Sequence, residues 1–400
     1  MDYSLTFRCA RVLVRAFWLA AMCVMAGCAR LPPTPIYANA IYGKPRLMLD
    51  MEINKDYTGF VELVAFAASG SALMATKNTL YLVANGKAQV IDYSTNDRLV
   101  MAPGGGIYGW IKRKSASAQF DFNLVEPSPA TGATLLQHGT FGFDGIHLGR
   151  QGGLIATSTP LEDWEGSRGA VEYDFWSRGG QLLAKVKYPE KAIGVIDPSG
   201  TALLLLGKSN AAAFNANGAE LWTHMGGYRK GVISDNAKVA LLNPRDPRNI
   251  DKAHLIIMGR QKTFELPSPI HHLALSPDGS MGAIAVDKGR LFLFKTALPK
   301  LKEVFLSIPG VSFITDVQFI DSGRIALGLI RSRDAIKDKR GHFTFSAASI
   351  LVVSTAGDTL FQHDFNLGNP ATYSPSIDVT YGLPYFSART PHRVLFVSLQ

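Results

Sequence analysis

Two glycine-containing stretches have the residue types and spacing of phosphate-binding loops. Residues 104–109 match the G-x-G-x-x-G pattern of a dinucleotide site, and residues 207–209 match the Gly-Lys-Ser end of a nucleotide-binding loop. Both motifs need a following helix whose N-terminus binds the phosphate. The residues after Gly109 instead read as a strand, and Ala202 occupies the position where the second motif requires a glycine. We therefore expect neither stretch to bind a nucleotide.

Other patterns of catalytic or metal-ligating residues are missing from the sequence. It contains no H-E-x-x-H, no G-x-S-x-G and no cluster of Cys and His. Its only cysteines are Cys9, Cys23 and Cys28, and two of these lie in the segment that we expect to be removed on export. We therefore expect no disulfide, no metal, no cofactor and no catalytic residue in the mature chain.

The N-terminus has the pattern of an export signal. Arg8, Arg11 and Arg15 precede an apolar run over residues 16–27, which is too short to span a bilayer. The run ends in small residues immediately before Cys28. We expect residues 1–27 to be a signal peptide, although ordinary export with a chance cysteine at this position is an alternative.

The residues Met25-Ala26-Gly27-Cys28 resemble the lipobox of bacterial lipoproteins. This resemblance implies that Cys28 becomes the first residue of the mature chain and is acylated, so that the bilayer is a partner. Ala29 follows where an aspartate would imply retention in the inner membrane, which favours the outer membrane. We expect the chain to face the periplasm, with display on the cell surface as the alternative.

Charge and composition are those of a folded protein without a nucleic-acid site. The net charge of +9 is mild for 400 residues, and no dense Lys/Arg stripe indicates binding to nucleic acid. After Cys28 the sequence is polar and contains prolines, which is typical of a tether over residues 28–45. We expect the folded domain to occupy residues 46–400.

From residue 46 onward, short apolar strands alternate with tight turns rich in Gly, Asp and Ser. Asp197, Asp278 and Asp321 each lie in such a turn, where an aspartate side chain accepts hydrogen bonds from the backbone. Four strands per repeat, with no long segment of helical periodicity, predict an all-β propeller of seven or eight four-stranded blades. The last repeat has only three strands, so we expect residues 46–51 to supply the fourth and close the ring. A β-sandwich or a solenoid is the alternative fold.

Two repeat types are similar to known propeller families. Residues 212–222, AAFNANGAELW, resemble the repeat of PQQ-like propellers, and residues 270–286 resemble the WD40 type. With the lipobox and the chain length, the sequence resembles the BamB-type propeller lipoproteins. This resemblance implies a non-enzymatic scaffold in envelope or outer-membrane assembly, with envelope proteins as partners.

Three long connections stand out among otherwise tight loops. They span residues 159–169, 243–254 and 331–343, and all three join the second and third strands of a repeat. In a propeller such connections lie on one face, and long loops on a rigid scaffold commonly bind partners. The candidate partner-binding residues are Trp164 on the first loop and, on the third, Arg331, Arg333, Lys337, Lys339 and Arg340. Tolerated insertions without a binding role are the alternative.

The connections between repeats bring a second set of residues toward the mouth of the central channel. These are Arg229, His271 and Asp316, with Lys230 and His272 beside them. Such a set would bind a small anion or a metal, but consecutive strand residues point to opposite faces, so the two histidines do not line the channel together. A periplasmic enzyme or small-ligand binder with its site here is the alternative to the scaffold.

Overall fold

The structure is a computed structural model in which the chain divides into two units, Met1–Asn39 and Ala40–Gln400. The described residues all belong to the second unit and comprise the strands, the adjoining turns and the continuous segment 180–306. The described ranges are 45–52, 63–66, 72–76, 79–84, 87–93, 98–101, 108–113, 120–128, 132–141, 145–149, 154–160, 169–177, 180–306, 311–331, 335–337, 343–371, 375–379, 385–390 and 393–399. Cys28 and the tether to residue 44 therefore lie outside them.

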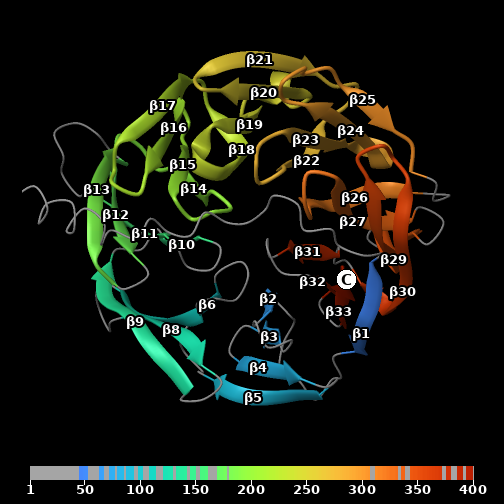
Figure 1. The fold of residues 1–400 in the computed structure, drawn as a ribbon, viewed down its shortest axis with the longest axis horizontal. Coiled ribbons are helices and arrows are strands. Elements are labelled where there is room, and N and C mark those ends of the chain that lie inside the picture. Colours follow the sequence, from blue (N-terminus) through green and yellow to red (C-terminus); the bar gives the residue numbers. More distant parts are fainter. Residues whose placement is uncertain are drawn as a thin grey trace, which may run out of the picture. The chain divides into compact units, whose positions relative to one another are not determined.

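The strands form eight antiparallel sheets, which follow one another around a circle as the blades of a propeller (Figure 1). Blades 1 and 2 contain β2 (Leu63–Phe66), β3 (Ala72–Ala75), β4 (Thr79–Ala84), β5 (Lys87–Tyr93), β6 (Arg98–Met101), β7 (Tyr108–Arg113), β8 (Phe120–Ser128) and β9 (Gly132–Phe141). Blades 3 and 4 contain β10 (Gly145–Leu148), β11 (Leu154–Pro160), β12 (Val171–Ser177), β13 (Leu182–Tyr188), β14 (Ile193–Ile196), β15 (Ala202–Leu206), β16 (Asn210–Asn215) and β17 (Glu220–Met225).

The second half of the ring has the same order. Blades 5 and 6 contain β18 (Tyr228–Ile233), β19 (Val239–Pro244), β20 (Lys252–Ile257), β21 (Arg260–Glu265), β22 (Ile270–Leu275), β23 (Met281–Val286), β24 (Arg290–Lys295) and β25 (Lys302–Val304). Blades 7 and 8 contain β26 (Val311–Phe319), β27 (Arg324–Arg331), β28 (Ala335–Lys337), β29 (Phe343–Ser354), β30 (Thr359–Ala371), β31 (Ser376–Val379), β32 (Tyr385–Thr390), β33 (Arg393–Ser398) and β1 (Arg46–Glu52).

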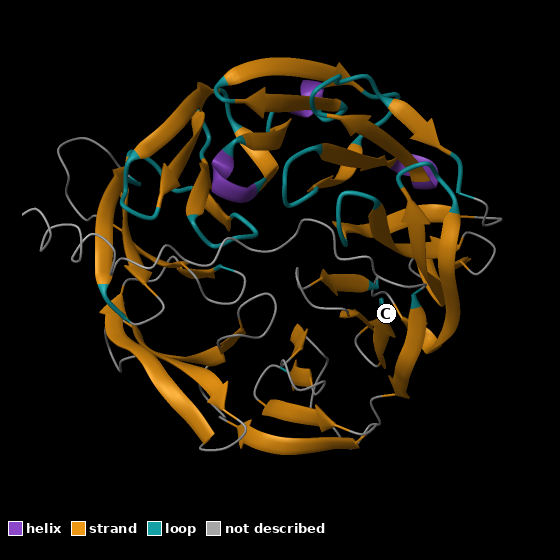
Figure 2. Cartoon of the chain, viewed as in Figure 1, coloured by secondary structure: helices purple, strands orange, loops and turns teal. Residues whose placement is uncertain are grey.

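Helix in the described residues is confined to three short 3-10 turns (Figure 2). They are η2 (Asp235–Ala237), η3 (Pro247–Asn249) and η4 (Asp287–Gly289). The expectation of an all-β propeller is confirmed, and the described strands form eight blades.

The ring is closed by the strand that comes first in the chain. β1 pairs with β33 in antiparallel register from Arg46 opposite Ser398 to Glu52 opposite Arg393. It thereby becomes the outermost strand of blade 8, whose other three strands come from the C-terminus. The expected closure by residues 46–51 is confirmed, and it pairs the edge that β33 would otherwise expose.

The hydrophobic core lies between neighbouring blades. β15 is buried at every residue because sheets cover both of its faces, whereas the outermost strand β13 is exposed at four of its seven residues. Phe175 of blade 3 packs in one cluster with Leu203 and Leu205 of blade 4. A corresponding cluster joins Leu293 of blade 6 to Phe319 of blade 7. In these clusters each blade thus packs its apolar residues against the next one around the ring.

The PQQ-like repeat at residues 212–222 joins three blades. Asn215 Oδ1 accepts hydrogen bonds from the N–H groups of Asn217 and Ala219, both at 3.0 Å, and shapes the turn between β16 and β17. Gly218 has a φ of +75° and lies so close to blade 3 that a Cβ here would be 2.8 Å from Ala184 Cβ. On the other side, Trp222 Nε1 donates to the carbonyl oxygen of Ala237 in blade 5 at 2.8 Å. The repeat is therefore a contact between blades as well as a turn.

Asp197 makes a similar connection from the first turn of blade 4. Its fully buried carboxylate accepts bonds from Ser199 Oγ, from the N–H and hydroxyl of Thr201, and from the N–H of Ala202, at 2.5–2.9 Å. It also accepts the N–H of Asn236 in blade 5 at 2.9 Å. Asp278, in the corresponding turn of blade 6, accepts bonds from Ser276 and Ser280 of its own turn. Both aspartates are turn residues as expected, but Asp197 also joins two blades.

This difference predicts unequal effects of removing the two carboxylates. We expect Asp197→Ala to lower the free energy of unfolding by about 3 kcal/mol, because buried donors lose their acceptor. The same change at the exposed turn residue Asp278 is expected to cost about 1 kcal/mol or less. Chemical denaturation of both variants measures the difference. Equal losses would show that the bond to Asn236 does not stabilise the contact between blades 4 and 5.

Candidate binding face and channel mouth

Alternating strand directions give each blade two ends. We call one end the loop face: it carries the connections between blades and those between the second and third strands, such as residues 245–251. The other end is the turn face, and it carries the turns within the first and second hairpins, such as residues 197–200 and 258–259. The strand ends that the three long connections of the sequence join lie at the loop face.

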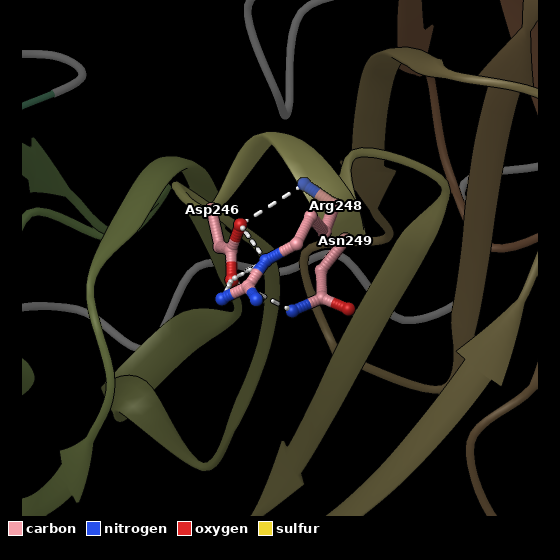
Figure 3. A network of polar contacts seen from close by, with 3 residues as sticks. All are labelled: Asp246, Arg248 and Asn249. Carbon is pink, nitrogen blue, oxygen red and sulfur yellow. Dashed lines mark hydrogen bonds and ion pairs between the residues drawn. The ribbon is translucent and has the colours of Figure 1, made fainter.

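The long connection of blade 5 is fixed by its own polar contacts (Figure 3). Asp246 caps η3 by accepting the N–H of Arg248 at 3.0 Å, and its carboxylate also accepts bonds from the Arg248 guanidinium at 2.9–3.2 Å. These bonds hold the pKa of Asp246 below its usual value. The N–H of Arg245 donates to Gly227 O, and that of Ile270 donates to Ile250 O. This connection is therefore an ordered part of the ring.

The long connection of blade 7 differs from the expected loop. Residues 335–337 form strand β28, which pairs with the start of β29 from Ala335 opposite Phe345 to Lys337 opposite Phe343. β29 and β30 also continue beyond the end of β27, with Phe345 opposite Ala371. We call β28 with residues 343–347 and 366–371 the blade 7 extension. The prediction of a loop over 331–343 was wrong in this part, because a strand within it adds to an edge of β29.

The candidate partner-binding residues are placed only in part. Arg331 ends β27 and Lys337 ends β28, so the backbone brings both to the loop-face end of blade 7. Arg333, Lys339, Arg340 and Trp164 lie outside the described residues. Their role in binding stays a prediction.

Exposed apolar residues on the loop face were missed by the sequence analysis. Met225 at the end of β17 and Phe305 after β25 have exposed fractions of 74% and 82%. Ile193 at the start of β14 and Phe313 near the start of β26 are also exposed. The sequence pattern did not identify them, because the ends of strands show no alternation from which an exposed side chain could be assigned.

Arg229, which was expected at the channel mouth, connects blades 5 and 6. Its guanidinium donates to Asn243 Oδ1 and to the carbonyl oxygens of Ile250 and Ile270, the latter two at 3.4 and 3.2 Å. Arg229 lies where the pairing of β18 with β19 shifts register between Tyr228 and Lys230. A β-bulge of this kind turns a side chain out of the normal alternation. The hydrogen bonds of the guanidinium therefore connect two blades.

The same irregularity recurs in the next blade. The pairing of β22 shifts register between Ile270 and His272, and His271 at the shift is hydrogen-bonded through Nε2 to Asp287. The Lys230 ammonium donates to the carbonyl oxygen of His271. Burial lowers the pKa of His272 to about 4, with a smaller effect from the charges of Lys230 and His271. Arg229, Lys230, His271 and His272 are therefore brought together at one junction.

Asp316 makes its described contacts elsewhere. Its Oδ1 accepts the N–H of Val317, and its Oδ2 accepts the N–H of Ile377 in blade 8, both at 2.8 Å. The neighbouring Thr315 hydroxyl donates to Pro375 O at 2.7 Å. Asp316 thus holds blade 7 to blade 8.

A further polar cluster on the loop face connects blades 4 and 5. The buried hydroxyl of Tyr228 lies 2.9 Å from His224 Nδ1 and 3.1 Å from His254 Nδ1. A phenol has one proton to donate, so it donates to one imidazole and accepts from the other. Burial, with the charges of His224 and Lys252, lowers the pKa of His254, and burial raises the pKa of Tyr228 to about 12. Both shifts favour the neutral forms of Tyr228 and His254.

The described residues contain no group of three or more His, Cys, Asp or Glu side chains that could hold a metal ion. In the same part of the chain, no helix is long and apolar enough to cross a membrane.

The fold and its two faces define an all-β protein of the eight-bladed propeller class. The sequence matches no family model and no curated protein. Solved structures similar to the chain include Sqt1 from Saccharomyces cerevisiae, with a TM-score of 0.56 at 11% identity over 90% of this chain and 100% of that one. The C-terminal WD40 domain of Sif2 gives 0.56 at 11% over 90% and 99%. BamB from Moraxella catarrhalis gives 0.53 at 12% over 88% and 99%. At these identities the likeness shows the propeller fold.

The neutral histidines predict that acid destabilises the ring. Because the pKa of His272 is lowered from 6.5 to about 4 in the fold, the unfolded chain binds more protons as the pH falls below about 6.5. We expect the free energy of unfolding to fall by roughly 2 kcal/mol between pH 7 and pH 4 from this residue. Urea titrations across this range measure the loss. His272→Gln is expected to flatten the profile, and a profile as steep as that of the unchanged chain would contradict this assignment.

Proposed function

We propose that this protein is a lipid-anchored scaffold of a bacterial cell envelope. In this proposal the acylated Cys28 holds the chain to the outer membrane, and the propeller binds envelope proteins on its periplasmic side. The support for the anchor is the sequence Met25-Ala26-Gly27-Cys28 after a basic and apolar leader. The resemblance to BamB-type propeller lipoproteins implies a role in envelope or outer-membrane assembly.

The observation that carries the binding role is the departure of blade 7 from the four-stranded pattern. The blade has a fifth strand, and β29 and β30, of 12 and 13 residues, extend past their neighbours at the loop-face end. Among the strands that the structure describes, the other seven sheets have four each. Extra strands are not needed for ring closure, which the four-stranded blades achieve. An added strand at an edge offers backbone N–H and C=O groups to a partner segment.

Exposed apolar side chains support the same face. Met225 and Phe305 are more than 70% exposed at the loop-face ends of blades 4 and 6. Aromatic and methionine side chains are enriched in protein interfaces relative to the rest of a protein surface. The ordered connection at Asp246 and Arg248 provides a charged and fixed neighbour in blade 5. A partner with both apolar and polar groups fits this surface.

A small-ligand or enzymatic site at the channel mouth is the second candidate. The hydrogen bond between His271 and Asp287 favours it, because a carboxylate orients an imidazole for proton transfer. Against it, the side chains of Arg229 and Asp316 are committed to contacts between blades. We therefore place the scaffold role first.

Crosslinking in intact membranes tests the scaffold role. We expect the unchanged chain to capture a defined envelope protein and a variant with residues 331–343 replaced by a three-residue turn to lose it. A control variant with Leu182→Ser and Leu183→Ser, on the turn face, is expected to retain the partner. Equal capture by the shortened variant, or no capture by the unchanged chain, would contradict the proposed function.

A further inference from the structure

The turn face carries exposed apolar side chains on five consecutive blades. Such residues occur at the start of the outermost strands of blades 3, 4 and 7 and in the second-hairpin turns of blades 5 and 6. Met258 and Leu298, in blades 5 and 6, are 80% and 77% exposed, and the others are 37–44% exposed. They are Leu182, Leu183, Leu221, Met258, Leu298 and Leu360. A row of this kind is unusual because single exposed apolar residues, rather than aligned ones, are normal on a protein surface.

Met258 has a backbone conformation that is strained for a residue other than glycine. It forms the two-residue turn between β20 and β21 with Gly259, and both residues have positive φ, at +48° and +80°. The first position of such a turn favours Asn, Asp or Gly, and other residues are strained there. The Met258 N–H donates to Lys238 O at 3.1 Å, which fixes the turn to the same blade. Folding alone therefore does not explain a methionine at this position.

Basic residues flank Met258 and Leu298, the two most exposed side chains of this row. Lys238, Arg260, Lys295 and Lys300 are exposed on the turn-face ends of blades 5 and 6. The acidic residues at these ends are Asp235 and Asp278, and the carboxylate of Asp278 accepts bonds from two serines. The local charge is therefore positive around the apolar tips.

The chain enters the propeller on this same face. β1 begins at Arg46, which pairs with Ser398 at the end of β33, and the end of a third strand lies on the turn face. Met48, two residues into β1, is 52% exposed. Residues 29–45 lead from here to Cys28, and at about 3 Å per extended residue they span at most about 50 Å. A membrane that holds Cys28 is thus within reach of the turn face.

We propose that the turn face of blades 3 to 7 docks on a bilayer with anionic headgroups. This proposal builds on the lipid anchor of the proposed function and names the surface that meets the membrane. Met258 and Leu298 enter the boundary between headgroups and acyl chains, while the four basic side chains contact phosphate groups. Shallow apolar insertion and basic charge act together in such interfacial binding. The loop face, on the opposite end of every blade, then points away from this membrane.

Vesicle co-sedimentation of the chain from Ala40 tests the surface without the anchor. This chain contains every described strand, and circular dichroism verifies that each preparation is folded. We expect binding to vesicles of phosphatidylethanolamine and phosphatidylglycerol, and at least tenfold weaker binding to pure phosphatidylcholine. Met258→Asn with Leu298→Asn is expected to lower the affinity for the anionic vesicles at least tenfold, without loss of thermal stability, because Asn tolerates the positive φ.

Met225→Asn is the matched control, since Met225 is an equally exposed methionine on the loop face. It is expected to bind vesicles like the unchanged chain. Equal binding by the Met258 and Leu298 variant, equal loss in the control, or no binding to anionic vesicles would overturn the docking surface. A change of oligomeric state in the Met258 and Leu298 variant would instead assign the face to a second copy. Each outcome is independent of Cys28 and of the partner captured by the loop face.

Discussion

The pairing of β1 with β33 is the constraint on which the eight blades depend. It joins residues 46–52 to residues 393–398, so the two ends of the domain belong to one sheet. Without this pairing, blade 8 would have three strands, and β33 would expose a row of unpaired backbone groups. Because each blade buries its apolar residues against its neighbours, an opening at blade 8 would also expose the cores on either side. Closure therefore contributes to the stability of every blade.

Polar contacts between neighbouring blades reinforce the closed ring at both faces. On the turn face, Asp197 accepts the N–H of Asn236, and Trp222 donates to Ala237 O. On the loop face, Arg229 donates to Ile270 O, and Asp316 accepts the N–H of Ile377. Different side chains thus connect neighbouring blades at different junctions. This variety is why the repeats share a pattern of turns while few of them share a motif.

The sequence predicted the fold well because turns and strand lengths are local properties. The turns and repeated strands indicated a propeller, and the missing strand of the last blade indicated its closure by residues 46–51; the structure confirms both. The channel-mouth residues were less predictable. Their positions depend on register shifts at Arg229 and His271, and a bulge arises from pairing with a strand elsewhere, which the local sequence does not reveal. β28 was not predicted, because three residues between charged neighbours have too little periodicity to indicate a strand.

The loop face and the turn face suit different roles. The loop face has the blade 7 extension and exposed apolar residues such as Phe305, which suit a protein partner. The turn face has Met258 in a strained turn, surrounded by basic side chains, and receives the first strand of the propeller. A lipid anchor ahead of that strand would orient the ring with its partner face toward the periplasm.

Mass spectrometry of the protein purified from its native membrane tests this account most directly. The account predicts a mature chain that begins at Cys28 and carries three acyl chains, with diacylglycerol on the sulfur and one acyl group on the nitrogen. Removal of Cys28 by substitution with alanine would leave an unacylated chain. A native protein that keeps residues 1–27, or that begins elsewhere with Cys28 unmodified, would contradict the lipid-anchored scaffold.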